Sequence, residues 1–250
     1  MKLLLTSDLH NELDWYAWLL KAAPDYNLVA ISGDLLDGFG DICLEIKNLR
    51  KWVSKFSEIG TKLVFCCGNH DLNGENIEFS DYYLENPNAR LTDLANPSRK
   101  GRWMDSLQMP DRVISSGQTV FLTVQNQGQI IVTTCWFTDD EDCNATFLKR
   151  GLELKAQYPE APWLVLHHEP PSGPLSAGIG GSATADSIIR SYAPDYMLCG
   201  HDHLGPFFTH QCFDLIGKTY VFNPGHRRMA NVPSYIELDT ATKLFQWHHQ

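Results

Sequence analysis

The chain has 250 residues, of which 43% are hydrophobic, and a formal net charge of −10 at pH 7. These values are typical of a soluble globular protein that is long enough for one large α/β core. The acidic charge argues against a nonspecific nucleic-acid-binding protein, because such a protein needs a basic surface to bind phosphates. The apolar run before Asp8 is too short for a signal peptide, and no run is long enough for a membrane span.

The seven cysteines are odd in number and include no CxxC pair. Several of them lie inside apolar runs, where cysteine behaves as a small hydrophobic residue. We therefore expect free thiols in a reducing compartment, and a cytoplasmic location.

Short β-like runs alternate with longer amphipathic patterns in the first part of the chain, as in stacked βα units. The pattern predicts strands at 2–7, 26–32 and 61–67, with helices at 11–23 and 41–60. Prolines and glycines then interrupt residues 74–118. We expect a single domain over residues 1–250 with an irregular excursion at about 74–118.

The second half of the chain is predicted to be richer in strands. A hairpin is expected at 119–134, around the turn sequence QNQG. Helices are predicted at 141–158 and 183–192, and strands at 161–168, 195–203, 218–225, 234–239 and 243–249. Two packed sheets with helices outside would accommodate both halves of the chain.

Five of the predicted strands end in carboxylate, amide or imidazole side chains. These groups are Asp8 with His10, Asp34, Asn69-His70-Asp71, His167-His168, and His201 with His203. Because the carboxyl ends of strands in open α/β sheets form a common crevice, we expect these side chains to converge. Imidazoles and carboxylates without a thiolate favour divalent ions such as Mn, Fe, Zn or Ni. The set is large enough for two ions that share a bridging carboxylate, an arrangement suited to displacement at phosphorus.

The order D-x-H, G-D, G-N-H-D, H, G-H-x-H between Asp8 and His203 resembles the calcineurin-like metallophosphoesterase superfamily. The resemblance implies an α/β fold with four layers, an αββα sandwich in which helices flank two mixed sheets. It also implies a dinuclear site at the strand ends. The implied reaction is hydrolysis of a phosphoester by a metal-bridging hydroxide.

The resemblance also assigns roles to residues by their position in the motifs. The first metal would be held by Asp8, His10 and His203, both metals by Asp34, and the second metal by Asn69, His167 and His201. His167 is preferred because it follows the strand directly, and His168 stays an alternative. His70 is the expected proton donor to the leaving group or transition-state stabiliser, and Asp71 is expected to orient it.

Three further groups are candidates for substrate or site contacts. Asn223-Pro224-Gly225 resembles the late turn of the family, so His226, Arg227 and Arg228 are expected to reach a substrate phosphate. The excursion carries Arg90, Arg99, Lys100, Arg102, Trp103 and Arg112, which could form a substrate-recognising cap or a solvated loop. The Asp37 carboxylate could bind a ligand histidine or be solvated.

The sequence therefore predicts a cytoplasmic enzyme that uses two divalent ions to hydrolyse a small phosphoester such as a nucleotide, with phosphodiesters favoured over phosphomonoesters. A phosphomonoesterase or a nucleotide pyrophosphatase would use the same site. A nuclease is disfavoured by the acidic charge. The alternative of another class is a non-catalytic protein-binding scaffold, which the complete ligand set disfavours. The sequence makes no prediction about the oligomeric state.

Overall fold

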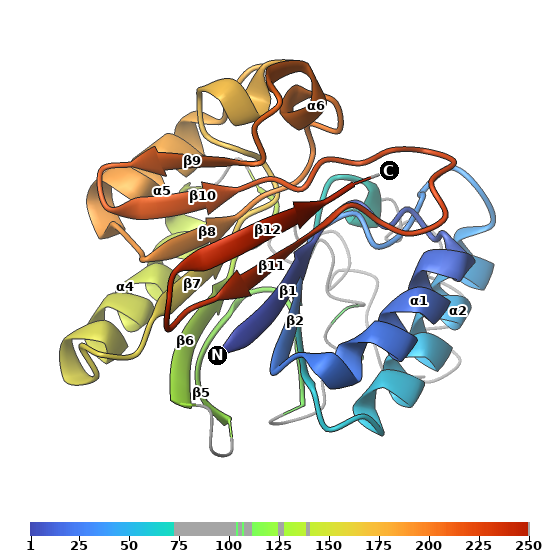
Figure 1. The fold of residues 1–250 in the computed structure, drawn as a ribbon, viewed down its shortest axis with the longest axis horizontal. Helices are drawn as coiled ribbons and strands as arrows, with labels where there is room; N and C mark the ends of the chain where they lie inside the picture. The colour runs from blue at the N-terminus through green and yellow to red at the C-terminus, as the bar shows by residue number, and fades with distance from the viewer. Residues whose placement is uncertain (73–103, 105–106, 108–111, 125–127, 139–140, 250) are drawn as a thin grey trace, which may run out of the picture.

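The computed structural model describes residues 1–72, 104, 107, 112–124, 128–138 and 141–249. Two sheets of six strands each pack against one another. Helices α1 and α2 cover one sheet and helices α4 and α5 cover the other (Figure 1). The predicted αββα sandwich with two mixed sheets is therefore confirmed.

The first sheet has the order β12-β11-β1-β2-β3-β4. Four of its strands are parallel to one another: β1 (Lys2–Thr6), β2 (Leu28–Ser32), β3 (Lys62–Cys66) and β4 (Val113–Ile114). β11 (Tyr235–Asp239) pairs antiparallel with β1, and β12 (Leu244–His248) pairs antiparallel with β11. The connections between the first three strands contain α1 (Leu13–Ala22), the 3-10 helix η1 (Ala23–Asp25) and α2 (Ile42–Ser57).

The second sheet has the order β5-β6-β7-β8-β10-β9. Its parallel strands are β6 (Gly128–Thr134), β7 (Trp163–Leu166), β8 (Tyr196–Leu198) and β10 (Thr219–Phe222), flanked by the antiparallel strands β5 (Gln118–Val124) and β9 (Phe213–Ile216). The helical segments are α4 (Glu141–Gln157), η6 (Pro174–Ser176), α5 (Ala183–Tyr192) and α6 (Gly205–Thr209).

The core forms three apolar layers because side chains alternate along each strand. Leu3 and Leu5 of β1 pack between the two sheets, whereas Leu4 packs toward α1 and α2. On the other sheet, Leu164 packs between the sheets and Val165 packs toward α4 and α5. Both faces of the central strands are covered, so the strands read as continuous apolar runs rather than as alternating sequences.

Several predicted strands are shorter in the structure than in the sequence prediction. The predicted strands at 161–168 and 195–203 end at Leu166 and Leu198, so their histidines lie in the following loops. The sequence prediction missed β4 and β9. The β5–β6 hairpin pairs as predicted, and its connecting residues 125–127 lie outside the described part of the chain.

Most of the predicted basic excursion lies outside the described residues, including Arg90, Arg99, Lys100, Arg102 and Trp103. Arg112 is described, and its guanidinium donates a hydrogen bond to the carbonyl of Ser57 at the end of α2. This arginine therefore holds the chain that enters β4 against a helix end, where a cation is favourable.

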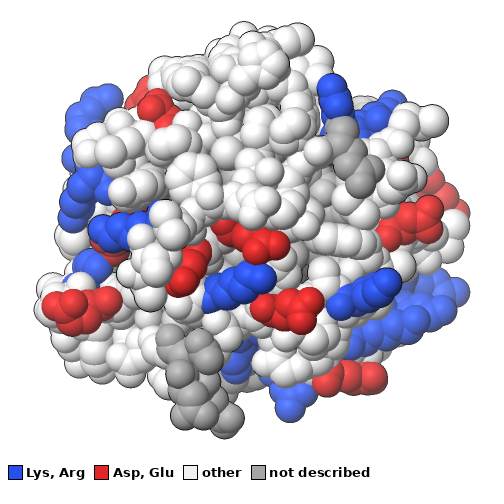
Figure 2. Space-filling model, in the orientation of Figure 1, with Lys and Arg blue, Asp and Glu red and all other residues white. Residues whose placement is uncertain are grey.

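Charged side chains of both signs lie side by side over the lower half of the face in Figure 2. Basic side chains therefore lie among acidic ones on this face. Within the described residues, the helices include none with the length and apolar character that crossing a membrane requires.

Five of the seven free cysteines are buried, Cys143 is partly exposed and Cys43 is exposed. Burial raises the pKa of the Cys67 and Cys212 thiols to about 12, so little reactive thiolate forms at pH 8. Titration of the folded protein with Ellman's reagent at pH 8 should therefore detect about two fast-reacting thiols, against seven in guanidinium chloride. Four or more fast thiols in folded protein would contradict this packing.

Candidate metal centre

The carboxyl ends of the parallel strands of both sheets meet at one place. The Ser32 hydroxyl at the end of β2 donates to the carbonyl of Leu198 on β8 at 2.9 Å. The His168 Nδ1 atom lies 2.7 Å from the carbonyl of Ser32, and the His201 N–H donates to the Asp8 carboxylate at 3.1 Å. These contacts bring loops from both sheets into one site.

Several of these loop residues have a backbone conformation that non-glycine residues rarely adopt. The φ angles of Asp8, His10, Asp34 and His201 are 53°, 45°, 50° and 64°. Gly68 makes the close packing possible, because a Cβ atom there would lie 2.2 Å from Asp34 Oδ1. Conformations of this kind cluster at functional sites, where the surrounding structure maintains them.

Four side chains form a first group of donor atoms. One ligand atom from each of Asp8, His10, Asp34 and His203 lies within 4.8 Å of all the others. His203 Nε2 is 3.2 Å from Asp8 Oδ1 and 3.1 Å from His10 Nε2. The distance from His10 Nε2 to Asp34 Oδ2 is 3.8 Å. The group has the size and composition of a metal-binding set.

A second group adjoins the first and shares one of its atoms. His168 Nε2 lies 3.3 Å from Asp34 Oδ2 and 3.1 Å from Asn69 Oδ1. The His201 ring packs beside the His168 ring, with 5.1 Å between their centroids. Asp34 Oδ2 therefore faces both groups, as a bridging carboxylate would.

The structure brings His168, rather than His167, to this site. His167 Nδ1 contacts the carbonyl of Glu169 at 2.9 Å, and the His167 side chain is buried. The reason is the alternation of strand β7, in which Leu164 and Leu166 face the other sheet. His168 continues that alternation and His167 does not, so the geometry favours His168, the alternative to His167.

The two buried carboxylates make the site attractive to cations. Asp8 and Asp34 are 0% and 1% exposed, and burial alone would raise their pKa values. The surrounding histidines outweigh burial, and both pKa values lie below the usual range. Conversely, burial would lower the pKa of His168, but the Asp34 carboxylate raises it to about 10.

The arrangement of these donor atoms suits bound divalent ions better than it suits hydrogen bonds among the side chains themselves. His10 and His203 direct ring nitrogens at each other, and His10 Nδ1 is buried without a hydrogen-bond partner among the described residues. With a pKa of about 10, His168 carries a proton that partly balances the carboxylate charge, and bound metal would replace it, since metal ligands must be deprotonated. The donor set of imidazoles, carboxylates and one amide therefore suits a pair of borderline divalent ions.

His70 lies at the edge of the two groups. Its backbone N–H donates to Asp34 Oδ1 at 2.9 Å, and its Nε2 lies 3.8 Å from Asp34 Oδ2. Its Nδ1 makes a short contact with the backbone carbonyl of Asp37. The carbonyl fixes the proton on Nδ1 and directs Nε2 toward the site.

Asp71, which the motif led us to expect beside His70, accepts hydrogen bonds from two backbone N–H groups. Its buried carboxylate accepts the backbone N–H groups of Leu36 at 2.9 Å and Gly68 at 2.8 Å. Burial, followed by the charge of Asp34, raises the pKa of Asp71 to about 7. Asp71 therefore ties the loop after β2 to the loop after β3. Its orienting role toward His70 stays a prediction.

A sequence profile described as calcineurin-like phosphoesterase matches residues 1–205 of the chain. The chain belongs to this family. The family and the donor groups together support a metal-dependent phosphoesterase. A search of curated protein sequences finds no match.

Solved structures share the phosphoesterase fold at low sequence identity. The TT1561 protein of Thermus thermophilus has 17% identity and a TM-score of 0.62, with 99% of this chain and 97% of that chain covered. A dimetal phosphatase from Danio rerio has 9% identity, a TM-score of 0.57 and coverage of 96% and 93%. The purple acid phosphatase PPD1 of yellow lupin (Lupinus luteus) has 10% identity, a TM-score of 0.56 and coverage of 95% and 49%. These similarities establish the fold.

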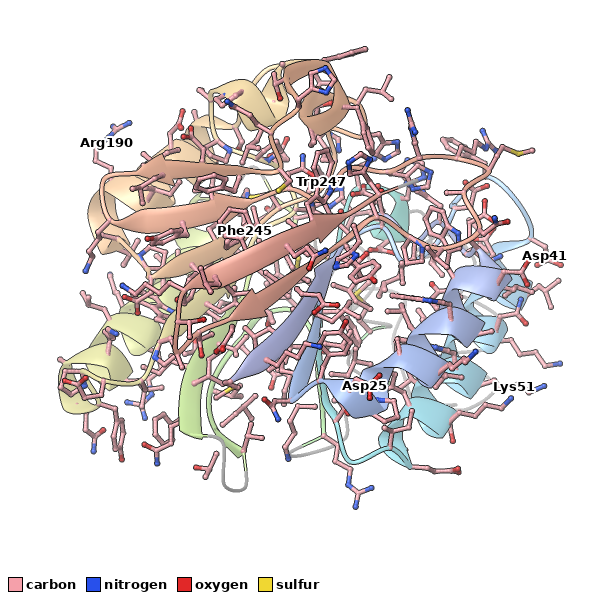
Figure 3. The ribbon with its side chains drawn as sticks, viewed as in Figure 1. Asp25, Asp41, Lys51, Arg190, Phe245 and Trp247 are labelled. Carbon is pink, nitrogen blue, oxygen red and sulfur yellow. The ribbon has the colours of Figure 1, made fainter. Side chains whose placement is uncertain are left out.

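The late turn of the phosphoesterase supports the metal-site loops instead of presenting His226 to solvent. His226 is 6% exposed, its Nδ1 lies 2.7 Å from the carbonyl of Asp8, and burial lowers its pKa to about 4. The Trp247 indole of β12 donates to the carbonyl of Pro224, just before His226 (Figure 3). Arg227 and Arg228 are exposed, and the Arg227 guanidinium lies 5.0 Å from the Phe207 ring.

Two residues of the phosphoesterase site lie outside the sequence motifs. Phe39 is 79% exposed, and its ring packs edge-on against His70 with 4.9 Å between the centroids. Asp37, through its carboxylate, forms a further group of donor atoms with His10 and His70, within 4.8 Å of one another. The Asp37 carboxylate thus lies beside ligand-type histidines, one of the two alternatives for this residue. No pattern in the sequence marks Phe39.

Proposed function

We propose that the protein hydrolyses a small phosphodiester with the aid of two divalent ions. One ion would be held by Asp8, His10, Asp34 and His203, and the other by Asp34, Asn69, His168 and His201. The observation that carries this proposal is the position of Asp34 Oδ2, which is 3.3 Å from His168 Nε2 and 3.8 Å from His10 Nε2. When bound, the two ions would activate a water molecule and neutralise charge on the phosphate oxygens.

In its doubly protonated imidazolium form, His70 is proposed to donate the Nε2 proton to the departing oxygen, which leaves the neutral ring with its proton on Nδ1. Its ring is held by the Asp37 carbonyl at Nδ1, so Nε2 is the atom directed at the substrate. The His70 side chain is 18% exposed, whereas Asp34 is 1% exposed, so His70 borders the solvent-accessible side of the site. A leaving group on that side can receive a proton without entering the buried cluster.

A diester fits the charge of the protein better than a monoester does. A phosphodiester carries one negative charge and a monoester carries up to two, and the chain has a net charge of −10. The exposed Phe39 ring beside His70 supports an aromatic leaving group, such as a nucleoside, because a flat apolar surface suits an aromatic ring. The cytoplasmic location stays a prediction, supported by the seven free thiols.

The direct test is hydrolysis of bis-p-nitrophenyl phosphate and p-nitrophenyl phosphate by metal-stripped protein resupplied with Mn²⁺. We expect metal-dependent turnover with the diester preferred, and a His70→Ala variant that is slower by roughly 100-fold or more because it lacks the proton donor. A preference for the monoester would make the protein a phosphomonoesterase. Failure to hydrolyse either ester with Mn²⁺, Fe²⁺, Zn²⁺ or Ni²⁺ would favour the non-catalytic scaffold.

A further inference from the structure

Glu45 is a buried carboxylate that lies outside every metal-ligand group described above. It is 4% exposed and belongs to the first turn of α2. Its Oε2 atom accepts two backbone N–H groups, from Asp37 at 3.0 Å and from Gly38 at 3.1 Å. A charged side chain in this position is costly to bury unless such hydrogen bonds compensate it.

The peptide that Glu45 holds is the one that orients His70. The carbonyl of Asp37 contacts His70 Nδ1. The backbone N–H groups of Asp37 and Gly38, which flank this carbonyl along the chain, both donate to Glu45 Oε2. The three groups form a continuous path from Glu45 through the Asp37 backbone to the imidazole. A shift of this peptide would move the only acceptor that the structure shows at His70 Nδ1 among the described residues.

The helix provides a rigid base for this path. The Asp41 carboxylate, labelled in Figure 3, caps α2 by accepting the N–H of Leu44 at 3.1 Å. The Glu45 N–H donates to the carbonyl of Asp41 at 2.9 Å, so the residue is part of the first helical turn. A carboxylate there is also stabilised by the positive end of the helix dipole. Gly40 packs so closely that a Cβ would lie 2.9 Å from Glu45 Oε1.

We infer that Glu45 is a positioning residue for the proton donor. It holds the Asp37 carbonyl so that the His70 imidazolium keeps its Nδ1–H on that carbonyl and transfers its Nε2 proton to the leaving group. This inference rests on the proposed function, since it concerns the protonation of a leaving group by His70. It differs from a purely structural role because it predicts an effect that depends on the leaving group and on His70 itself.

The kinetic test compares Glu45→Ala, Glu45→Gln, His70→Ala and the Glu45→Ala/His70→Ala double variant. The substrates are diphenyl phosphate and bis-p-nitrophenyl phosphate, with Mn²⁺-loaded protein. Glu58→Ala is the matched control, because Glu58 is an exposed residue at the other end of the same helix. Circular dichroism and metal content verify that each variant is folded and loaded.

We expect Glu45→Ala to lower kcat for diphenyl phosphate by roughly 10- to 100-fold with little change in KM, since misplaced catalytic groups cost about that much. The loss should be several-fold smaller for bis-p-nitrophenyl phosphate, because p-nitrophenolate departs with less need for a proton. Glu45→Gln should retain most of the activity, because both N–H groups converge on one oxygen that an amide can supply. In the His70→Ala background, Glu45→Ala should cause no further loss.

An equal loss on both substrates, or a further loss on top of His70→Ala, would overturn the inference. A second readout works even if the wild-type protein hydrolyses neither ester, which would refute the proposed function alone. Nitrogen-15 NMR of the His70 ring should find the Nδ1–H tautomer in wild type and Glu45→Gln, and a mixture of tautomers in Glu45→Ala. An unchanged tautomer in folded Glu45→Ala would also overturn the inference.

Discussion

Asp34→Asn will lower turnover by at least about 1,000-fold, which corresponds to ~4 kcal/mol of transition-state stabilisation. The substitution keeps the volume of the side chain but removes the negative charge that faces both donor groups. An amide also places N–H donors against His168 Nε2 or His10 Nε2, which lie 3.3 Å and 3.8 Å from Asp34 Oδ2 in the structure. Metal content should fall together with activity, from about two ions per chain to one or fewer. Steady-state kinetics and inductively coupled plasma mass spectrometry measure the two effects.

Asp14→Asn provides the matched control, because Asp14 is an exposed aspartate in α1. It makes the same chemical change and should leave activity and metal content as in the wild type. Full metal content in Asp34→Asn, together with more than a tenth of the wild-type turnover, would refute the bridging role of Asp34.

His168→Ala will lower metal content and activity, whereas His167→Ala will lower stability, although the two residues are adjacent. His168 Nε2 faces Asp34 and Asn69, so its removal should lower metal occupancy to about one ion per chain. Activity should fall by more than roughly 100-fold, because even residues that only support metal ligands cost 10- to 100-fold when they are lost. His167 contacts the carbonyl of Glu169, and its removal should destabilise the fold by about 1–3 kcal/mol while both ions are retained.

The two variants can be compared under identical conditions by metal analysis, turnover and urea denaturation. A His167→Ala protein that folds but loses one ion would reverse the assignment. The same holds for a His168→Ala protein that retains both ions. Each variant is the control for the other, because both remove a buried imidazole from the same loop.

Much of the fold could be predicted from the sequence because each central strand is visible as an apolar run of its own. The run LLL in β1 and the run LVAI in β2 are apolar without interruption, as central strands covered on both faces must be. The short strand β4 carries only two residues, Val113 and Ile114, and no pattern of that length is distinguishable from a loop. β9 (Phe213–Ile216) has mostly half-exposed side chains at a sheet edge, so its apolar signal is weak.

The candidate metal-site residues that directly follow a strand end were the easiest to predict. Asp8, Asp34 and Asn69 lie where their motifs place them, within the groups of donor atoms. The choice between His167 and His168 depended on which face of β7 packs against the other sheet. Leu164 and Leu166 lie on that face, and His168 continues their alternation. Strand alternation was thus the criterion that would have identified His168 from sequence.

The residues that support the site were beyond sequence reasoning because they act through the backbone. Glu45 reaches the site by accepting N–H groups of Asp37 and Gly38, and His226 reaches it through the carbonyl of Asp8. Backbone groups have no signature in the sequence, so the contact of His70 Nδ1 with the Asp37 carbonyl could not be predicted. Only the three-dimensional arrangement shows these contacts.

An anomalous difference map from crystals of the Mn²⁺-loaded protein tests the dinuclear site most directly. We expect two peaks roughly 3.5–4 Å apart on either side of the Asp34 carboxylate. One peak should lie among Asp8, His10 and His203, and the other should lie beside Asn69 and His168. A single peak, or a second peak coordinated by His167 rather than His168, would contradict the proposed dinuclear site.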